Sequence, residues 1–141
     1  MKMLIPSDGS DAALRSVEHA IDTAGLYVNG IEVHLLNVQL PILSGNVRLF
    51  ITREKIEEYY REEGMAALSG AKAKLDAAGI VCHTHVGVGN VAETILQYAR
   101  QNGCDQICMT KSGMGALSRI FLGSVAAKLI HLSEIPVLLI N

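Results

Sequence analysis

The sequence lacks a strong excess of charge and lacks a long apolar run. Its 141 residues include 12 basic and 14 acidic side chains, spread along the chain, for a formal net charge of −2. Because no basic stripe is present, a nucleic acid is not expected as a partner. Half of the residues are hydrophobic, yet no apolar run approaches the roughly 18 residues that span a bilayer. The sequence therefore predicts no membrane segment.

Cysteine is also scarce. The three cysteines, Cys82, Cys104 and Cys108, are odd in number and lie in or beside apolar runs. This placement is typical of reduced, buried thiols and argues against a disulfide framework. The first residues, Met1–Pro6, form an apolar stretch too short for a signal peptide and favour a first strand instead. We expect a cytoplasmic protein.

What the sequence does contain is a regular alternation of strand and helix patterns. Strands are predicted at Met3–Pro6, Ile31–Val38, Ile80–Val86, Gln106–Met109 and Ile135–Ile140. Helices are predicted from Ser10 or Asp11 to Gly25, over Thr52–Ala78, from Asn90 to Gly103, and from about Ser124 to Leu132. The segment from Ile42 to Ile51 has neither periodicity and is predicted to be a loop.

This alternation predicts an α/β fold in which a doubly wound, mostly parallel five-stranded sheet has helices on both faces. Ligands of such sheets bind beyond the carboxyl ends of the strands, where the strand order reverses. The loops richest in small and polar residues follow the first strand (Ser7–Ser10) and the fourth (Thr110–Gly115). A strand order of 3-2-1-4-5 would place both loops beside one crevice, although periodicity alone does not determine that order.

The stretch Met109–Val125 joins a strand, a loop with three glycines and the start of a helix. The first amides of a helix lack intrahelical acceptors, and its N-terminus carries about half a positive charge. Glycine allows the backbone to approach an anion closely. The stretch is therefore interpreted either as a phosphate-binding loop or as an ordinary loop with glycines at its turns.

Four motifs together resemble the universal stress protein family. They are Pro6-x-Asp8-Gly9-Ser10, the run Gly113–Arg119, Gly123-Ser124 and the closing run Pro136–Ile140. The resemblance covers residues 1–141 as one domain. It implies a nucleotide-binding domain with strand order 3-2-1-4-5, of the adenine nucleotide α-hydrolase-like type, that usually forms a homodimer. Many members bind ATP through a pattern of glycine, two residues, glycine, nine residues, glycine, then serine or threonine.

The resemblance also implies individual roles. Asp8, preceded by Pro6 and Ser7, corresponds to an aspartate near the ribose and adenine. Val38 matches a position whose backbone meets the adenine edge, and Met109 lies where the base or ribose is flanked. The phosphates of ATP, or of AMP or ADP, would be bound by Gly113, Met114, Gly115, the amides of Gly123, Ser124 and Val125, and the Ser124 hydroxyl. Magnesium could accompany them.

One position departs from the family pattern, which opens with glycine where this chain has Thr110. If that position requires a positive φ or bare backbone, a β-branched residue there is costly. If it requires only a small residue at a strand end, threonine is tolerated and its hydroxyl could bond a phosphate. Nearby, Lys111 and Arg119 could neutralise a phosphate, with Lys111 the better placed.

The remaining candidate constellations are weaker. His83 and His85 alternate onto one face of the third strand as a possible metal pair. No third ligand is evident nearby in the sequence, so a half-exposed strand face is the simpler interpretation and no metal site is predicted. Asp8 is also the kind of residue that accepts phosphate in receiver domains, but the third strand ends in Val86–Gly89, without the acidic residue that such domains need.

Three functions stay open at this point. The favoured one is a non-catalytic, ATP-binding sensor or regulator of the stress response, because no His or Glu is placed to orient an attacking water. The others are a slow ATPase or phosphotransferase, and a family member that has lost nucleotide binding and acts through a protein partner. The uncharged run Ile135–Ile140 would lie at the sheet edge and predicts a dimer contact through Val137 and Leu139.

Overall fold

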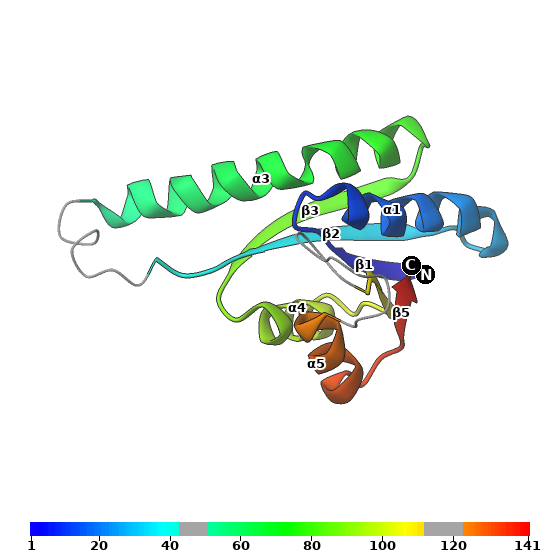
Figure 1. Ribbon diagram of the computed structural model, residues 1–141. Helices are drawn as coiled ribbons and strands as arrows, with labels where there is room; N and C mark the ends of the chain where they lie inside the picture. The colour runs from blue at the N-terminus through cyan, green and yellow to red at the C-terminus, as the bar shows by residue number, and fades with distance from the viewer. Residues whose placement is uncertain (43–50, 112–122) are drawn as a thin grey trace.

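The computed structural model describes residues 1–42, 51–111 and 123–141. Its centre is a sheet of five parallel strands in the order β3-β2-β1-β4-β5, which confirms the predicted 3-2-1-4-5 arrangement (Figure 1). The strands are β1 (Lys2–Pro6), β2 (Glu32–Gln39), β3 (Val81–Val88), β4 (Gln106–Thr110) and β5 (Val137–Ile140). The first three strands are added toward one edge of the sheet, and β4 and β5 are added on the other side of β1. The strand order therefore reverses between β1 and β4, which is the topological switch point of the sheet.

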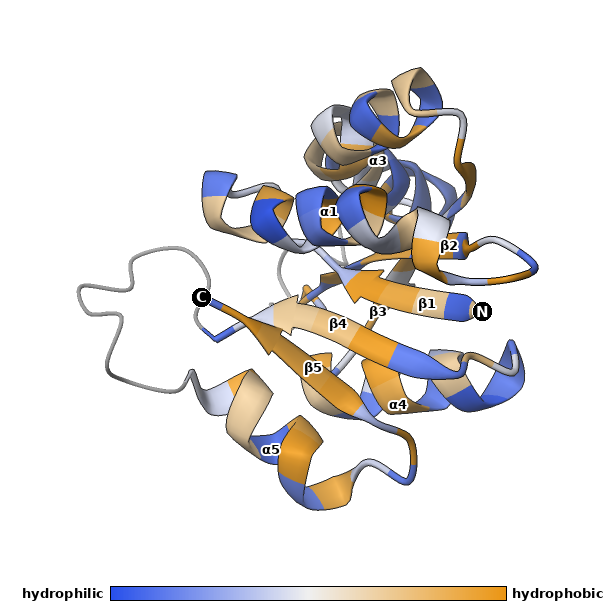
Figure 2. Ribbon diagram, turned by 90° about the vertical axis from the view of Figure 1, so that its right-hand side faces the viewer, coloured by the Kyte–Doolittle hydropathy of each residue, from blue (hydrophilic) through white to orange (hydrophobic). Residues whose placement is uncertain are grey.

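Helices cover both faces of the sheet. The described helices are α1 (Asp11–Thr23), the short 3₁₀ helix η1 (Ala24–Leu26), α3 (Arg53–Ala77), α4 (Val91–Gln101) and α5 (Ser124–Leu132). Figures 1 and 2 show α1 and α3 on one face and α4 and α5 on the other. None of the helices in the described ranges is both long enough and apolar enough to cross a membrane.

Side-chain caps determine where three of these helices begin. The hydroxyl of Ser10 accepts from the Ala13 amide, and Thr52 and Asn90 cap α3 and α4 in the same way. Each cap satisfies one of the amides that the first helical turn leaves without an intrahelical acceptor. Helix α5 differs, because Gly123 is its N-cap and makes no side-chain hydrogen bond.

The core consists of two layers, one on each face of the sheet. Val33 and Leu35 of β2 pack with Leu68 and Leu75 of α3, whereas Leu36 packs on the opposite face with α4 and α5. In the central strand β1, residues 3–5 are fully buried because both faces are covered. The orange strands in Figure 2 show this continuous apolar character. The three cysteines are free thiols, as predicted, with Cys104 and Cys108 buried and Cys82 half-buried.

Several boundaries differ from the sequence prediction, and the last strand begins at Val137 instead of Ile135. The third strand continues to Val88 instead of turning at Gly87, because β2 supplies backbone partners as far as Gln39. The turn begins at Gly89, whose φ of +145° is a glycine conformation. At the first helix, the chain continues past Gly25 as the 3₁₀ turn η1. The predicted loop at 42–51 falls mainly outside the described residues.

Candidate functional site

A cavity of about 460 Å³ lies at the carboxyl ends of β1 and β4. This volume is within the range of small-molecule sites, about 300–1,000 Å³. Ten of the thirteen residues predicted for the site line it together: Pro6, Ser7, Asp8, Val38, Met109, Thr110, Lys111, Gly123, Ser124 and Val125. The other three, Gly113, Met114 and Gly115, lie outside the described residues, as does Arg119. The structure thus joins two segments more than a hundred residues apart into one site.

The turn after β1 is held by one hydrogen bond to β2 and by two within the turn itself. The Ser7 amide donates to the Leu36 carbonyl at 2.9 Å, so this turn continues the pairing with β2. The hydroxyl of Ser7 accepts from the Gly9 amide, and a carboxylate oxygen of Asp8 accepts from the Ser10 amide at 2.9 Å. Gly9 has a φ of +83°, a conformation that glycine adopts without steric cost. These bonds fix Asp8 at the rim of the cavity.

Asn37 is a lining residue that was not predicted from the sequence. The residue is only 4% exposed, and its side-chain amide nitrogen donates to the Ser7 carbonyl at 2.9 Å. The Asn37 side-chain oxygen accepts a short hydrogen bond from Gln39. The signal available in the sequence was a single amide side chain inside the apolar run 33–38. Because buried polar groups need partners, such a residue marks a position with a specific contact.

The start of α5 forms the opposite wall. The Gly123 amide donates to the Lys111 carbonyl at 2.7 Å, and the Gly123 carbonyl accepts from Ala127 at 2.9 Å. The Gly123 amide is therefore already engaged, contrary to its predicted role as a phosphate donor. The next amides, those of Ser124 and Val125, belong to the first helical turn, whose amides have no intrahelical acceptor. Both residues line the cavity.

Thr110 is the last residue of β4, where it pairs with Ile140 of β5. No residue other than glycine has a positive φ in the described ranges. Thr110 therefore has ordinary strand backbone, so the cost of a β-branched residue at a positive φ does not arise. The alternative that the position requires bare backbone beside a nucleotide stays a prediction. Thr110 as a whole is 6% exposed and lines the cavity. A bond from its hydroxyl to a phosphate stays a prediction.

The wall between the two ends is mostly apolar. Leu36 and Val38 come from β2, Met109 from β4, and Val91 and Ile95 from α4. Among the lining residues that the structure describes, the charged groups are Asp8 on the β1 side and Lys111 on the α5 side. The cavity therefore has an acidic rim, an apolar middle and an anion-attracting end.

Comparisons with known proteins agree with this architecture. The sequence profile of the Universal stress protein family matches residues 1–141. The chain belongs to the universal stress protein family. A universal stress protein of Methanocaldococcus jannaschii is 34% identical over 142 residues, covering 99% of this chain and 81% of the relative. The solved structure of hypothetical protein MJ0577 is similar with a TM-score of 0.83 and 29% identity, covering 99% of this chain and 94% of the other.

Two more distant universal stress proteins share the fold and were solved with ligands. One is a complex with cAMP, with a TM-score of 0.70, 20% identity, and coverage of 100% of this chain and 96% of the other. The other, from Arabidopsis thaliana, has AMP bound, with a TM-score of 0.68, 18% identity, and coverage of 99% and 90%. At these identities the likeness establishes the fold alone.

Proposed function

We propose that the cavity binds an adenine nucleotide, ATP or its relatives ADP and AMP, and that the protein senses this ligand without consuming it. The observation that supports the proposal is the meeting of the Asp8 turn and the α5 N-terminus in one cavity. A carboxylate suits ribose hydroxyls, and unpaired helix amides suit phosphate. The AMP and cAMP complexes of two family members are consistent with it.

In this arrangement the adenine lies against the apolar wall between Val38 and Met109. The ribose hydroxyls donate to Asp8, and the phosphates accept from the amides of Ser124 and Val125. Lys111 adds positive charge, and magnesium would accompany the phosphates of ATP. No histidine or glutamate is among the described lining residues, so a general base for hydrolysis is not evident there. A phosphate-release assay on pure protein should therefore show no turnover.

The sharpest test replaces Ser124, the first helical residue of α5, by proline. Proline is favoured at this position, and Gly123 already has the extended ψ of 154° that suits a residue before proline. Ser124→Pro thus removes one amide donor and one hydroxyl while leaving the helix start intact. Since a hydrogen bond to a charged group contributes about 1.5–3 kcal/mol, ATP affinity should fall at least about tenfold.

Two control variants make the result interpretable. Ser124→Ala removes the hydroxyl alone and should weaken ATP binding less than Ser124→Pro does. Arg53→Pro places proline at the equivalent first position of α3, remote from the cavity, and should leave affinity unchanged. Adenosine, which has no phosphate, should bind wild type and Ser124→Pro equally. Affinities are measured by isothermal titration calorimetry. Equal ATP affinity of wild type and Ser124→Pro would show that the phosphates do not bind at the start of α5. Absence of binding to wild type at millimolar ATP would refute the proposal.

The proposed assembly is a homodimer through β5. This strand lies at the edge of the sheet, and its four residues are half-buried in the single chain. An apolar edge invites pairing with a second copy, and Val137 and Leu139 are the residues we expect at the contact. Light scattering should report a dimer for wild type and a monomer for Leu139→Lys. A Leu139→Lys dimer would exclude this interface.

A further inference from the structure

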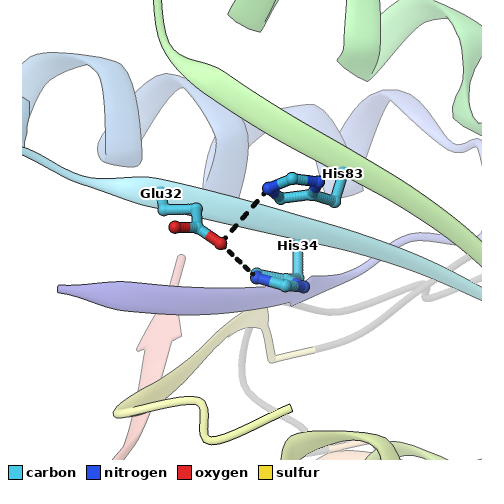
Figure 3. A group of neighbouring side chains, drawn as sticks. All are labelled: Glu32, His34 and His83. Atoms are coloured by element: carbon cyan, nitrogen blue, oxygen red, sulfur yellow. Dashed lines mark hydrogen bonds and ion pairs between the residues drawn. The ribbon is translucent and has the colours of Figure 1, made fainter.

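A second polar cluster lies on the sheet away from the cavity. Glu32 and His34 are two residues apart near the start of β2, so they point to the same face. In the parallel register, His34 lies opposite His83 of the edge strand β3. Figure 3 shows one carboxylate oxygen of Glu32 joined to both imidazole rings. No third ligand is evident near His83 in the sequence because these partners lie some fifty residues earlier in the chain.

The distances within this cluster suit a small cation. The Glu32 Oε1 atom lies 2.9 Å from His34 Nε2 and 3.2 Å from His83 Nε2. One ligand atom from each residue lies within 4.8 Å of the other two. Ligands about 2.0–2.1 Å from a tetrahedral zinc ion are separated by about 3.3 Å. The two distances from Glu32 to the histidines are therefore close to the spacing that a bound ion would impose, and the histidine nitrogens lie within 4.8 Å of each other.

His34 is held in orientation by a second contact. Its side chain is 8% exposed, and its Nδ1 lies 3.0 Å from the Tyr98 hydroxyl of α4. Histidines that ligate metals use their other ring nitrogen for such an orienting hydrogen bond. The His83 side chain is 53% exposed, so the cluster is open to solvent on one side. An ion can therefore enter without unfolding the sheet.

We propose that Glu32, His34 and His83 bind one divalent transition-metal ion of the zinc class. Two imidazole nitrogens and a carboxylate oxygen form a donor set that zinc accepts, and three protein ligands leave the fourth position to water. Without metal, His34 Nε2–H donates to Glu32 and the Tyr98 hydroxyl donates to Nδ1. With metal, Nε2 binds the ion, the proton moves to Nδ1, and the Tyr98 oxygen becomes the acceptor. The ion would join β3 to β2.

This proposal is tested on nucleotide-free, chelator-treated protein, with Zn²⁺ as the calorimetric probe and Co²⁺ as the spectroscopic one. Wild type should bind one Zn²⁺ per chain and give Co²⁺ ligand-field absorption. His83→Gln and Glu32→Gln each remove a ligand and should weaken Zn²⁺ binding by more than about tenfold. Tyr98→Phe removes the hydrogen bond that orients His34 and should weaken Zn²⁺ binding by about tenfold. His19→Gln, on α1, is the control and should bind like wild type.

The folded state of each variant is checked by circular dichroism and by its melting temperature without metal. Because binding to the folded chain alone raises stability, Zn²⁺ should raise the melting temperature of wild type and of His19→Gln but not of His83→Gln. Absence of saturable 1:1 binding to wild type would overturn the proposal and leave the cluster as an ion-paired network. Equal Zn²⁺ affinity of a well-folded His83→Gln variant would also overturn it.

Discussion

Replacing Gly64 by alanine should destabilise the protein, although alanine is the better helix former. Gly64 is buried in the middle of α3 where this helix crosses β3. A Cβ at this position would meet both methyl groups of Val86, one of them at 2.5 Å. Real Cβ contacts are not that short, and Val86 is β-branched with few alternative rotamers. Helix α3 and the edge strand β3 would therefore have to move apart.

The size of the effect follows from two opposing contributions. Alanine gains about 1 kcal/mol over glycine in a helix interior, whereas an extra methyl group in a packed core costs about 1–3 kcal/mol. The net loss should be about 1 kcal/mol, or about 2–4 °C in melting temperature for a domain of this size. Gly70 in the same helix is the matched control, because it is exposed and a Cβ there meets nothing within 4 Å. Gly70→Ala should stabilise by about 0.5–1 kcal/mol.

Urea unfolding followed by circular dichroism measures both free energies. The decisive quantity is the difference between Gly64→Ala and Gly70→Ala, because it cancels the helix-propensity contribution. Val86→Ala removes the obstructing methyl groups, so the double variant should recover the helix gain, with a coupling energy of about 1–3 kcal/mol. Equal effects of the two glycine substitutions, or no coupling with Val86→Ala, would refute the proposed close contact between α3 and β3.

Further expectations concern the site and the thiols. Asn37→Ala leaves the Ser7 carbonyl without its buried donor, so the free energy of unfolding should fall by about 1–3 kcal/mol. Calorimetry should also show weaker nucleotide binding. An unchanged nucleotide affinity would show that Asn37 does not support the binding site. Burial raises the pKa of the Cys108 thiol from 9.0 to about 11, so this thiol stays protonated at pH 8. A thiol reagent should therefore label half-buried Cys82 before Cys108. Early labelling of Cys108, detected by mass spectrometry, would contradict its burial. Because the unfolded Cys108 thiol ionises near pH 9 and the folded one near 11, the free energy of unfolding should fall as pH rises between these values, and Cys108→Ala should lessen that fall in urea titrations.

Local signals predicted much of the architecture. The sequence predicted that helices begin at Asn90 and at either Ser10 or Asp11, because capping depends on residue type and on a few adjacent residues. The apolar runs located all five strands, since strands buried on both faces are nearly continuously hydrophobic. The strand order was implied by the family motifs and not by periodicity. The extension of β3 to Val88 was missed, because the length of a strand depends on the partner beside it.

The candidate site divides in the same way. Motif positions identified Asp8 and Ser124, and the structure brings them to one cavity. It also changes one role, since the Gly123 amide already donates to Lys111. That bond joins residues twelve positions apart in the chain, and no local pattern reports it.

The sequence by itself determined the alternation of elements, the helix starts and the chemistry available at the strand ends, because these depend on neighbours along the chain. Tertiary structure alone decided which distant side chains meet. Asn37 donates to the Ser7 carbonyl and Glu32 lies between two histidines because the parallel strands pair in one particular register. Gly64 leaves room for Val86 because α3 packs closely against β3. These contacts depend on strand register and helix position, and a shift of one residue along β3 would turn His83 to the other face of the sheet.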